Sequence, residues 1–198
     1  MKKALFLDRD GTVNKMVKKY SRSYNKIIED TPFSLQELVF NDGIKELADG
    51  AKKIGYKLII ITNQPSIIKG ESSLKDYEEI TKKICEFLKI DRSSIFECFH
   101  KEGYSLECNC RKPSPGLFLM AKGMHDIDLK KSVMIGDSWK DIKAAKTAGI
   151  GKTIFLRRME NKNQFGNRED EEKMRELKIL PDFFSDDLME VHKILKNI

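Results

Sequence analysis

The sequence predicts an α/β fold, a Rossmann-like three-layer sandwich with a mostly parallel sheet. Short apolar runs alternate with segments whose apolar residues recur at helical spacing, the pattern of parallel strands joined by helices. The run KLIIIT at residues 57–62 is apolar on both faces, as expected for a strand buried inside such a sheet. No internal repeat or linker divides the chain, so we expect a single domain over residues 1–198.

The elements follow one another in a regular order. The apolar runs predict strands at residues 4–7, 57–62, 95–100, 132–135 and 153–156. Amphipathic spacing predicts helices at residues 43–54, 73–88, 115–125, 139–148 and 186–195. Gly55 and Gly149 fit the ends of two of these helices, and Ser73 with Asp76 forms a capping box at the start of another.

Two segments interrupt this alternation. Residues 14–40 are polar and basic without clean periodicity, which predicts a long loop or a small flap after the first strand. Residues 157–178 are highly charged, which predicts a mobile loop with a short helix. Loops of this length are usually functional or disordered, so both segments are candidates for shaping a binding site.

The formal net charge of +6 fits an anionic substrate or a nucleic-acid partner. A solvated lysine-rich surface explains the same charge, because the lysines are scattered and form no block. No apolar run reaches the ~18 residues that a membrane span needs. The apolar stretch at residues 4–7 is too short for a signal peptide, so we expect a cytoplasmic protein without membrane contact.

Two carboxylates follow the first strand, in the sequence Asp8-Arg9-Asp10-Gly11-Thr12. Ligands of parallel sheets bind beyond the carboxyl ends of the strands, and strand alternation places Asp8 and Asp10 on the same side. One carboxylate can attack phosphorus while the other moves protons. Gly11 permits a tight turn there.

Polar groups follow other strands as well. Thr62, Asn63 and Gln64 come after the KLIII strand and can hold phosphoryl oxygens, although a plain turn explains them equally. Arg111 and Lys112 are adjacent cations that fit a phosphate, or an ordinary surface pair.

The strand at residues 132–135 leads into Gly136-Asp137, with Asp141 one helical turn later. Magnesium prefers a few carboxylates together with water and substrate phosphate, which Asp8, Asp10 and Asp137 can provide at the top of one sheet. Asp141 either supports this site or only caps the following helix.

This ordered set resembles the haloacid dehalogenase superfamily of phosphohydrolases: DxDGT, a Thr after a buried strand, a Lys, and GDxxxD. The resemblance implies that Asp8 is the nucleophile. It implies that Asp10 is the general acid/base, with its backbone carbonyl on Mg²⁺. Thr62 and Lys112 would hold the phosphoryl group, Asp137 would bind Mg²⁺, and Asp141 would support that metal shell.

The cysteines predict a second metal site. Cys98, His100, Cys108 and Cys110 form a C-x-H…C-x-C array, and three thiolates with one imidazole match a closed tetrahedral zinc site. Disulfides or free thiols are the alternative. A closed site is structural, and this one immediately precedes Arg111-Lys112, so zinc would stiffen the loop that carries those cations.

With DRDGT, TNQ and C-x-C-RKP, the chain is similar to the histidinol-phosphatase-like branch of the superfamily, and above all to its heptose-bisphosphate phosphatases. The resemblance implies a protein without a large cap domain, able to act as a monomer, that removes the C7 phosphate of a heptose 1,7-bisphosphate in surface-glycan biosynthesis. Asn63, Gln64 and Arg111 would contact this sugar phosphate.

The chain departs from the heptose enzymes at Pro65-Ser66 and at Ser138, where Ser-Gly and Lys are usual. Histidinol phosphate and nucleic-acid 3′-phosphate ends are alternative substrates. Against nucleic acid, no aromatic residues interleave with a basic stripe. A phosphate-binding module without activity is the non-enzymatic alternative.

Overall fold

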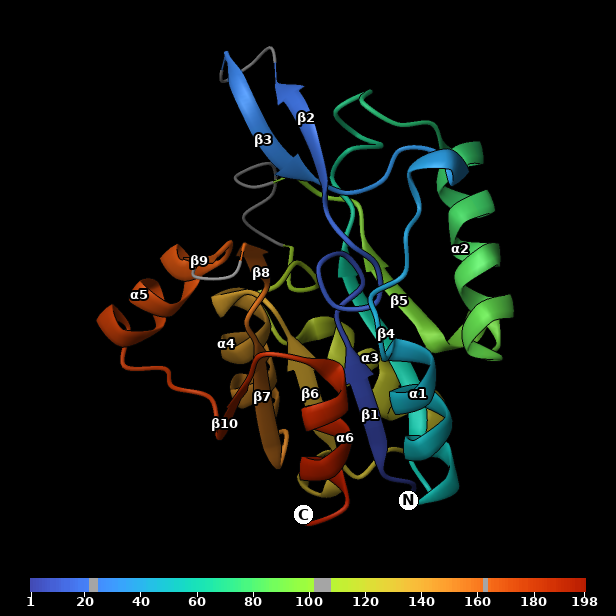
Figure 1. Cartoon of the computed structure of the whole chain (residues 1–198). Helices are drawn as coiled ribbons and strands as arrows, with labels where there is room; N and C mark the ends of the chain where they lie inside the picture. Colours follow the sequence, from blue (N-terminus) through green and yellow to red (C-terminus); the bar gives the residue numbers. More distant parts are fainter. Residues whose placement is uncertain (22–24, 102–107, 162–163) are drawn as a thin grey trace.

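The structure, a computed structural model, describes residues 1–21, 25–101, 108–161 and 164–198. Its centre is a six-stranded sheet in the order β10-β7-β6-β1-β4-β5, in which every pair of neighbours is parallel. The strands are β1 (Ala4–Leu7), β4 (Lys57–Asn63), β5 (Ile95–Cys98), β6 (Val133–Gly136), β7 (Lys152–Leu156) and β10 (Phe183–Ser185). Figure 1 shows this sheet with helices on both of its faces.

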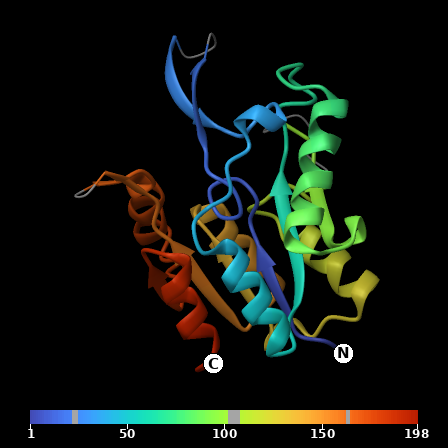
Figure 2. The ribbon, with the colours of Figure 1, turned by 45° about the vertical axis from the view of Figure 1, so that its right-hand side comes forward.

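The two faces of the sheet are covered by different helices. The helices are α1 (Ile44–Lys53), α2 (Leu74–Leu88), α3 (Gly116–His125), α4 (Trp139–Ala148), α5 (Arg168–Glu176) and α6 (Leu188–Leu195). Residues of α1, α2 and α6 share one buried cluster with one face of the strands, whereas α3 and α4 share a second cluster with the other face. This arrangement confirms the predicted three-layer sandwich, and Figure 2 shows the layers from another side.

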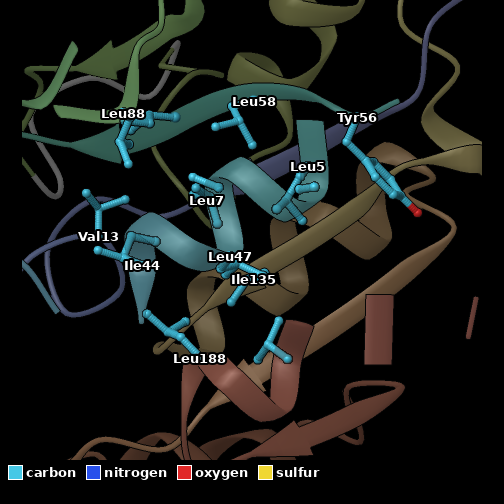
Figure 3. Close-up of a cluster of buried hydrophobic side chains, with 14 of the residues drawn as sticks. Leu5, Leu7, Val13, Ile44, Leu47, Tyr56, Leu58, Leu88, Ile135 and Leu188 are labelled. Atoms are coloured by element: carbon cyan, nitrogen blue, oxygen red, sulfur yellow. The ribbon is translucent and has the colours of Figure 1, made fainter. Parts of the chain in front are cut away.

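Alternation along β1 explains how one strand serves two cores. Leu5 and Leu7 belong to the cluster under α1 and α6, whereas Ala4 and Phe6 belong to the cluster under α3 and α4. Successive side chains of a strand point to opposite faces, so a strand covered on both sides is apolar at every position. Figure 3 shows Leu5 and Leu7 among Leu47, Ile135 and other buried side chains of the first cluster.

The predicted strands and helices agree with the structure to within a few residues. The largest differences are at β5, which ends at Cys98 and not at residue 100, and at α6, which begins at Leu188 and not at residue 186. The Asp187 side chain accepts a hydrogen bond from the Glu190 N–H and caps α6, so the helix starts after this residue. β10 precedes this cap and is too short to be recognised by periodicity.

The segment at residues 14–40 contains a small flap, as predicted. Strands β2 (Val17–Ser21) and β3 (Lys26–Asp30) pair antiparallel as a two-stranded sheet of their own. This pair stands above the carboxyl edge of the central sheet in Figure 1. A short 3₁₀ turn, Leu35–Glu37, follows it.

The charged segment at residues 157–178 has more structure than the predicted loop with a short helix. The helix is present as α5, and strands β8 (Met159–Asn161) and β9 (Gln164–Phe165) pair antiparallel before it. Met174 anchors α5 against Phe155 and Ile142 in a third buried cluster. Among the described residues, no helix has the length and apolar character that a membrane span requires.

Candidate active site

The carboxyl ends of β1, β4 and β6 meet at one edge of the sheet, where the predicted catalytic side chains gather. A cavity of about 380 Å³ opens there. Its lining includes most of the predicted site: Asp8, Asp10, Thr62, Asn63, Arg111, Lys112 and Asp141. Side chains that are more than a hundred residues apart in sequence therefore line one chamber.

Lys112 is the central cation of this site. Its Nζ lies 2.5 Å from Asp8 Oδ1 and 2.6 Å from Asp141 Oδ1, and it also donates to the Ile61 carbonyl at 2.9 Å. Only 4% of the Lys112 side chain is exposed. A buried ammonium is retained when opposite charges and acceptors surround it, and the two carboxylates fulfil this condition.

Three carboxylates form a cluster beside Lys112. One oxygen from each of Asp8, Asp137 and Asp141 lies within 4.8 Å of the others. Burial, followed by the negative charge of Asp141, raises the pKa of Asp8 to about 7 despite the neighbouring ammonium. Burial also raises the pKa of Asp137 well above its ordinary value. A hard divalent cation would relieve this crowding, so the donor set fits Mg²⁺.

Two glycines permit the close approach of these carboxylates. Gly11 has φ +96°, and a Cβ there would lie 2.1 Å from Asp137 Oδ2. A Cβ on Gly136 would lie 2.4 Å from the Asp141 Cβ. Any larger residue at either position would push a cluster carboxylate away, which explains the glycine in each of the two motifs.

The two carboxylate oxygens of Asp141 have different partners. Its Oδ2 accepts the Ser138 N–H at 3.1 Å, which completes a capping box at the start of α4. Its Oδ1 lies against Lys112. The helix cap therefore holds this carboxylate in place beside the cluster.

The Asp10 side chain points to a separate set of partners. It accepts hydrogen bonds from Arg9 Nε at 3.0 Å, Asn14 Nδ2 at 3.0 Å and Gln64 Nε2 at 2.5 Å. Burial raises the pKa of Asp10, but the Arg9 charge and these hydrogen bonds outweigh it, and the net pKa is lowered. The contact of its backbone carbonyl with Mg²⁺ stays a prediction.

Asn63 and Gln64 both hold catalytic candidates in place. Asn63 accepts the Lys112 N–H and donates to the Lys112 carbonyl, both at 3.0 Å. Gln64 donates to Thr62 Oγ1 at 2.8 Å as well as to Asp10. Their expected contacts with substrate stay predictions, whereas these contacts fix Lys112 and Asp10 relative to β4.

Arg111 connects the cavity to the cysteine cluster. Its side chain donates to the His100 carbonyl at 2.9 Å, and its backbone N–H donates to Cys108 Sγ at 3.4 Å. The Arg111–Lys112 pair therefore extends directly from the cluster. Its placement depends on how firmly the four cluster residues are held together.

The cluster of Cys98, His100, Cys108 and Cys110 is compact. The six distances between the three Sγ atoms and His100 Nδ1 range from 3.1 to 3.7 Å. Ligands about 2.0–2.3 Å from a tetrahedral zinc are about 3.3–3.8 Å apart, so the atoms fit the corners of such a site. The cysteines form no disulfide.

Several residues that support the site were not predicted from the sequence. Arg9 is almost fully buried, donates to Thr31 Oγ1 at 2.7 Å as well as to Asp10, and lies over the Tyr77 ring. Arg158 pairs with Asp137, and Asn167 donates to the Asp137 carbonyl at 2.7 Å. Only Arg9, inside DRDGT, could have been noticed from sequence, because the other residues reach the site by tertiary folding.

The model of haloacid dehalogenase-like hydrolases matches residues 23–149, and a model of HAD-hydrolase-like proteins matches residues 109–191. The chain is 37% identical over 163 residues to D-glycero-alpha-D-manno-heptose-1,7-bisphosphate 7-phosphatase of Photorhabdus laumondii, covering 78% of this chain and 82% of that protein. It is 39% identical over 158 residues to D-glycero-beta-D-manno-heptose-1,7-bisphosphate 7-phosphatase of Helicobacter pylori, covering 78% and 83%.

Among solved structures, D,D-heptose 1,7-bisphosphate phosphatase from B. bronchiseptica, complexed with magnesium and phosphate, is similar over 98% of both chains. The TM-score is 0.74 at 26% sequence identity. The sequence motifs, the parallel sheet and these relatives agree with one another. The chain belongs to the haloacid dehalogenase-like hydrolases.

Proposed function

We propose that this hydrolase is a Mg²⁺-dependent phosphatase that acts through an aspartyl-phosphate on Asp8 and removes the C7 phosphate of D-glycero-D-manno-heptose 1,7-bisphosphate. The observation that carries the proposal is the Asp8 carboxylate in the cavity, paired with Lys112 and within 4.8 Å of the Asp137 and Asp141 oxygens. The names of the relatives support the choice of substrate.

In the first half of the reaction, an Asp8 oxygen forms a bond to phosphorus while the bond from phosphorus to the sugar oxygen breaks. Lys112 neutralises charge on the transferring group, and Thr62 donates its hydroxyl to a phosphoryl oxygen. Asp10 gives its proton to the departing sugar oxygen. Asp10 is ionised in the free protein, so it takes up this proton from solvent when the arriving phosphate dianion favours the protonated form and raises its pKa.

In the second half, Asp10 removes a proton from water, the water oxygen attacks phosphorus, and the bond to Asp8 breaks. This step regenerates the Asp8 carboxylate and releases inorganic phosphate. The lowered pKa of Asp10 means that the free protein carries this group as a carboxylate, the form that can accept a proton. Mg²⁺ held by Asp8, Asp137 and the Asp10 carbonyl, with Asp141 supporting them, would neutralise phosphoryl oxygens when bound.

The cysteine cluster, called the thiol cluster from here on, is proposed as a structural zinc site. Its ligands would be Cys98, His100, Cys108 and Cys110. Four protein ligands leave no position for substrate. Its contribution is to hold Arg111 and Lys112, which contact or follow the cluster directly. Arg111 is proposed to bind the sugar phosphate.

Phosphate release with Mg²⁺ tests the function on a panel of five substrates. The panel contains the α and β anomers of heptose 1,7-bisphosphate, heptose 7-phosphate, histidinol phosphate and a 3′-phosphorylated oligonucleotide. The expected result is the highest kcat/KM for one heptose bisphosphate anomer, with heptose 1-phosphate as the product. Preference for histidinol phosphate or the oligonucleotide would overturn the substrate, and no turnover at all would favour a binding module.

Acid quenching during turnover tests the mechanism. The peptide that carries Asp8 should gain the mass of one phosphoryl group, and the peptide from an Asp8→Asn variant should not. A phosphorylated peptide elsewhere in the chain, or turnover without any phosphoryl mass on the Asp8 peptide, would overturn the covalent route.

A further inference from the structure

Arg158 is a partly buried cation beside the carboxylate cluster, and none of the roles above uses it. It lies two residues beyond the end of β7, and its Nε is 2.6 Å from Asp137 Oδ2. Only 20% of its side chain is exposed. Within the described part of the chain, its Nη1 also contacts Glu29 of β3. The guanidinium therefore connects the flap to a carboxylate of the cluster.

The backbone of Arg158 is fixed as firmly as its side chain. Its N–H donates to Asn167 Oδ1 at 3.0 Å, and Asn167 Nδ2 donates to the carbonyls of Asp137 and Leu156. Asn167 is 1% exposed. One buried amide thus ties the end of β7, the Asp137 loop and the start of α5 together, and it holds Arg158 at Asp137.

The charges at the site show what Arg158 changes. The carboxylates of Asp8, Asp10, Asp137 and Asp141 face the cations of Arg9, Lys112 and Arg158. With Mg²⁺ added, these seven side chains have a net charge of +1, or zero when Glu29 is included, and without Arg158 each sum is one unit lower. The positive charge of Arg158, in contact with Asp137, repels a metal cation bound at the cluster and attracts a phosphate dianion.

We propose that Arg158 is a positioning residue that acts through Asp137: it fixes this carboxylate and sets the site charge, so that metal affinity is lowered and phosphate affinity is raised. Glu29, on the flap, offsets part of the positive charge of the Arg158 guanidinium. The flap is thereby linked to the balance between metal affinity and phosphate affinity. Met16 and Glu29 line both the catalytic cavity and a second cavity of about 410 Å³ that Arg158 also lines. The proposal rests on the proposed function for the assignment of Asp137 as a metal ligand.

Binding measurements test this proposal without turnover. Calorimetric titrations with Mg²⁺ alone, and with inorganic phosphate in saturating Mg²⁺, are made on wild type, Arg158→Gln and Arg158→Lys. For Arg158→Gln we expect the Kd of Mg²⁺ to fall about threefold or more and the Kd of phosphate to rise about fivefold or more, as a lost unit charge nearby implies. Arg158→Lys keeps the charge and should shift both constants less.

The matched control is Arg168→Gln, which removes one positive charge from the exposed face of α5. It should leave both constants unchanged. If Arg158→Gln weakens Mg²⁺ and phosphate together, the residue only supports the fold, and the proposal is wrong. The proposal is also wrong if neither constant moves.

A second pair of variants tests the link to the flap. Glu29→Gln should tighten phosphate binding in the wild-type background and have a smaller effect when Arg158 is already Gln. An equal effect in both backgrounds would remove the link. Because none of these titrations requires catalysis, opposite shifts in a protein that hydrolyses no phosphate ester would retain the role of Arg158 and reject only the proposed function.

Discussion

The carboxylate cluster of Asp8, Asp137 and Asp141 and the thiol cluster that begins at Cys98 lie at the same edge of the sheet, beyond β1, β6 and β5. The thiol cluster takes its four candidate ligands from one stretch, residues 98–110, and the candidate ligand atoms lie 3.1 to 3.7 Å apart. Asp8 and Asp137 follow the ends of two strands that are far apart in sequence, Asp141 lies in the first turn of α4, and Asp8 and Asp141 line a cavity.

The difference shows how ligand chemistry separates a structural metal from a catalytic one. Soft thiolates complete the coordination of zinc and leave no position for substrate. Hard carboxylates beside a cavity leave positions for water and phosphate, as Mg²⁺ requires. The same sheet edge therefore carries both kinds of donor set, and Arg111–Lys112 is the short connection between them.

Replacement of Asp8 should have the largest effect, because it should lower the catalytic rate at the carboxylate cluster and leave the thiol cluster unchanged. Asp8→Asn keeps the shape of the side chain and removes the attacking oxygen, so we expect kcat to fall by at least about 10³-fold. Steady-state phosphate release measures this loss, and zinc content should not change. Asp126→Asn, at an exposed position beside the N-terminus, is the control and should keep full activity. Substantial residual activity in Asp8→Asn would contradict a covalent role.

Replacement of Asp137 should have the next largest effect. Asp137→Asn removes one negative ligand, and we expect the Mg²⁺ concentration for half-maximal rate to rise at least about tenfold. Titration of the rate with Mg²⁺ measures this change. The thiol cluster should again retain its zinc. An unchanged Mg²⁺ dependence would show that Asp137 is not a ligand.

The sequence contained much of both clusters but little of what supports them. The thiol ligands were predictable because they lie in one stretch, and Asp8 and Asp137 were predictable because each follows an apolar strand. Arg158 and Asn167 were not, because they reach Asp137 only when residues 157–178 fold back as β8, β9 and α5. No local periodicity encodes such a contact. The strands β2 and β3 were also missed individually, since a short, polar, exposed pair has no buried face to set its pattern.

Replacement of Cys108 should affect the thiol cluster and reach the catalytic site only indirectly. Cys108→Ser removes one thiolate and the acceptor of the Arg111 N–H, so we expect loss of zinc, a lower Tm and a fall in kcat/KM of about tenfold. Elemental analysis, thermal unfolding and phosphate release measure these changes. Cys85→Ser is the matched control, because Cys85 packs against the core outside the cluster and should leave zinc in place. Absence of zinc from the wild-type protein would overturn the assignment.

The smallest expected effect is a dependence of Mg²⁺ stabilisation on pH. The folded-state pKa of Asp8 is about 7, against an ordinary value of 3.8, because burial and Asp141 disfavour its ionised form. The metal-free folded state therefore holds a proton that the unfolded chain releases, and this residue makes the fold less stable as pH rises from about 4 through about 7.

Mg²⁺ binds the ionised carboxylate, so protons compete with it in the lower part of this range. We expect the rise in Tm on adding Mg²⁺ to be small at about pH 5.5 and larger at about pH 8, measured by thermal unfolding in both conditions. Asp8→Asn lacks this titration and should show a weaker dependence. An equal Mg²⁺-induced shift at both pH values in the wild-type protein would mean that Asp8 does not titrate against the metal, and the contrast between a proton-sensitive open site and a closed thiol site would have to rest on Asp137 alone.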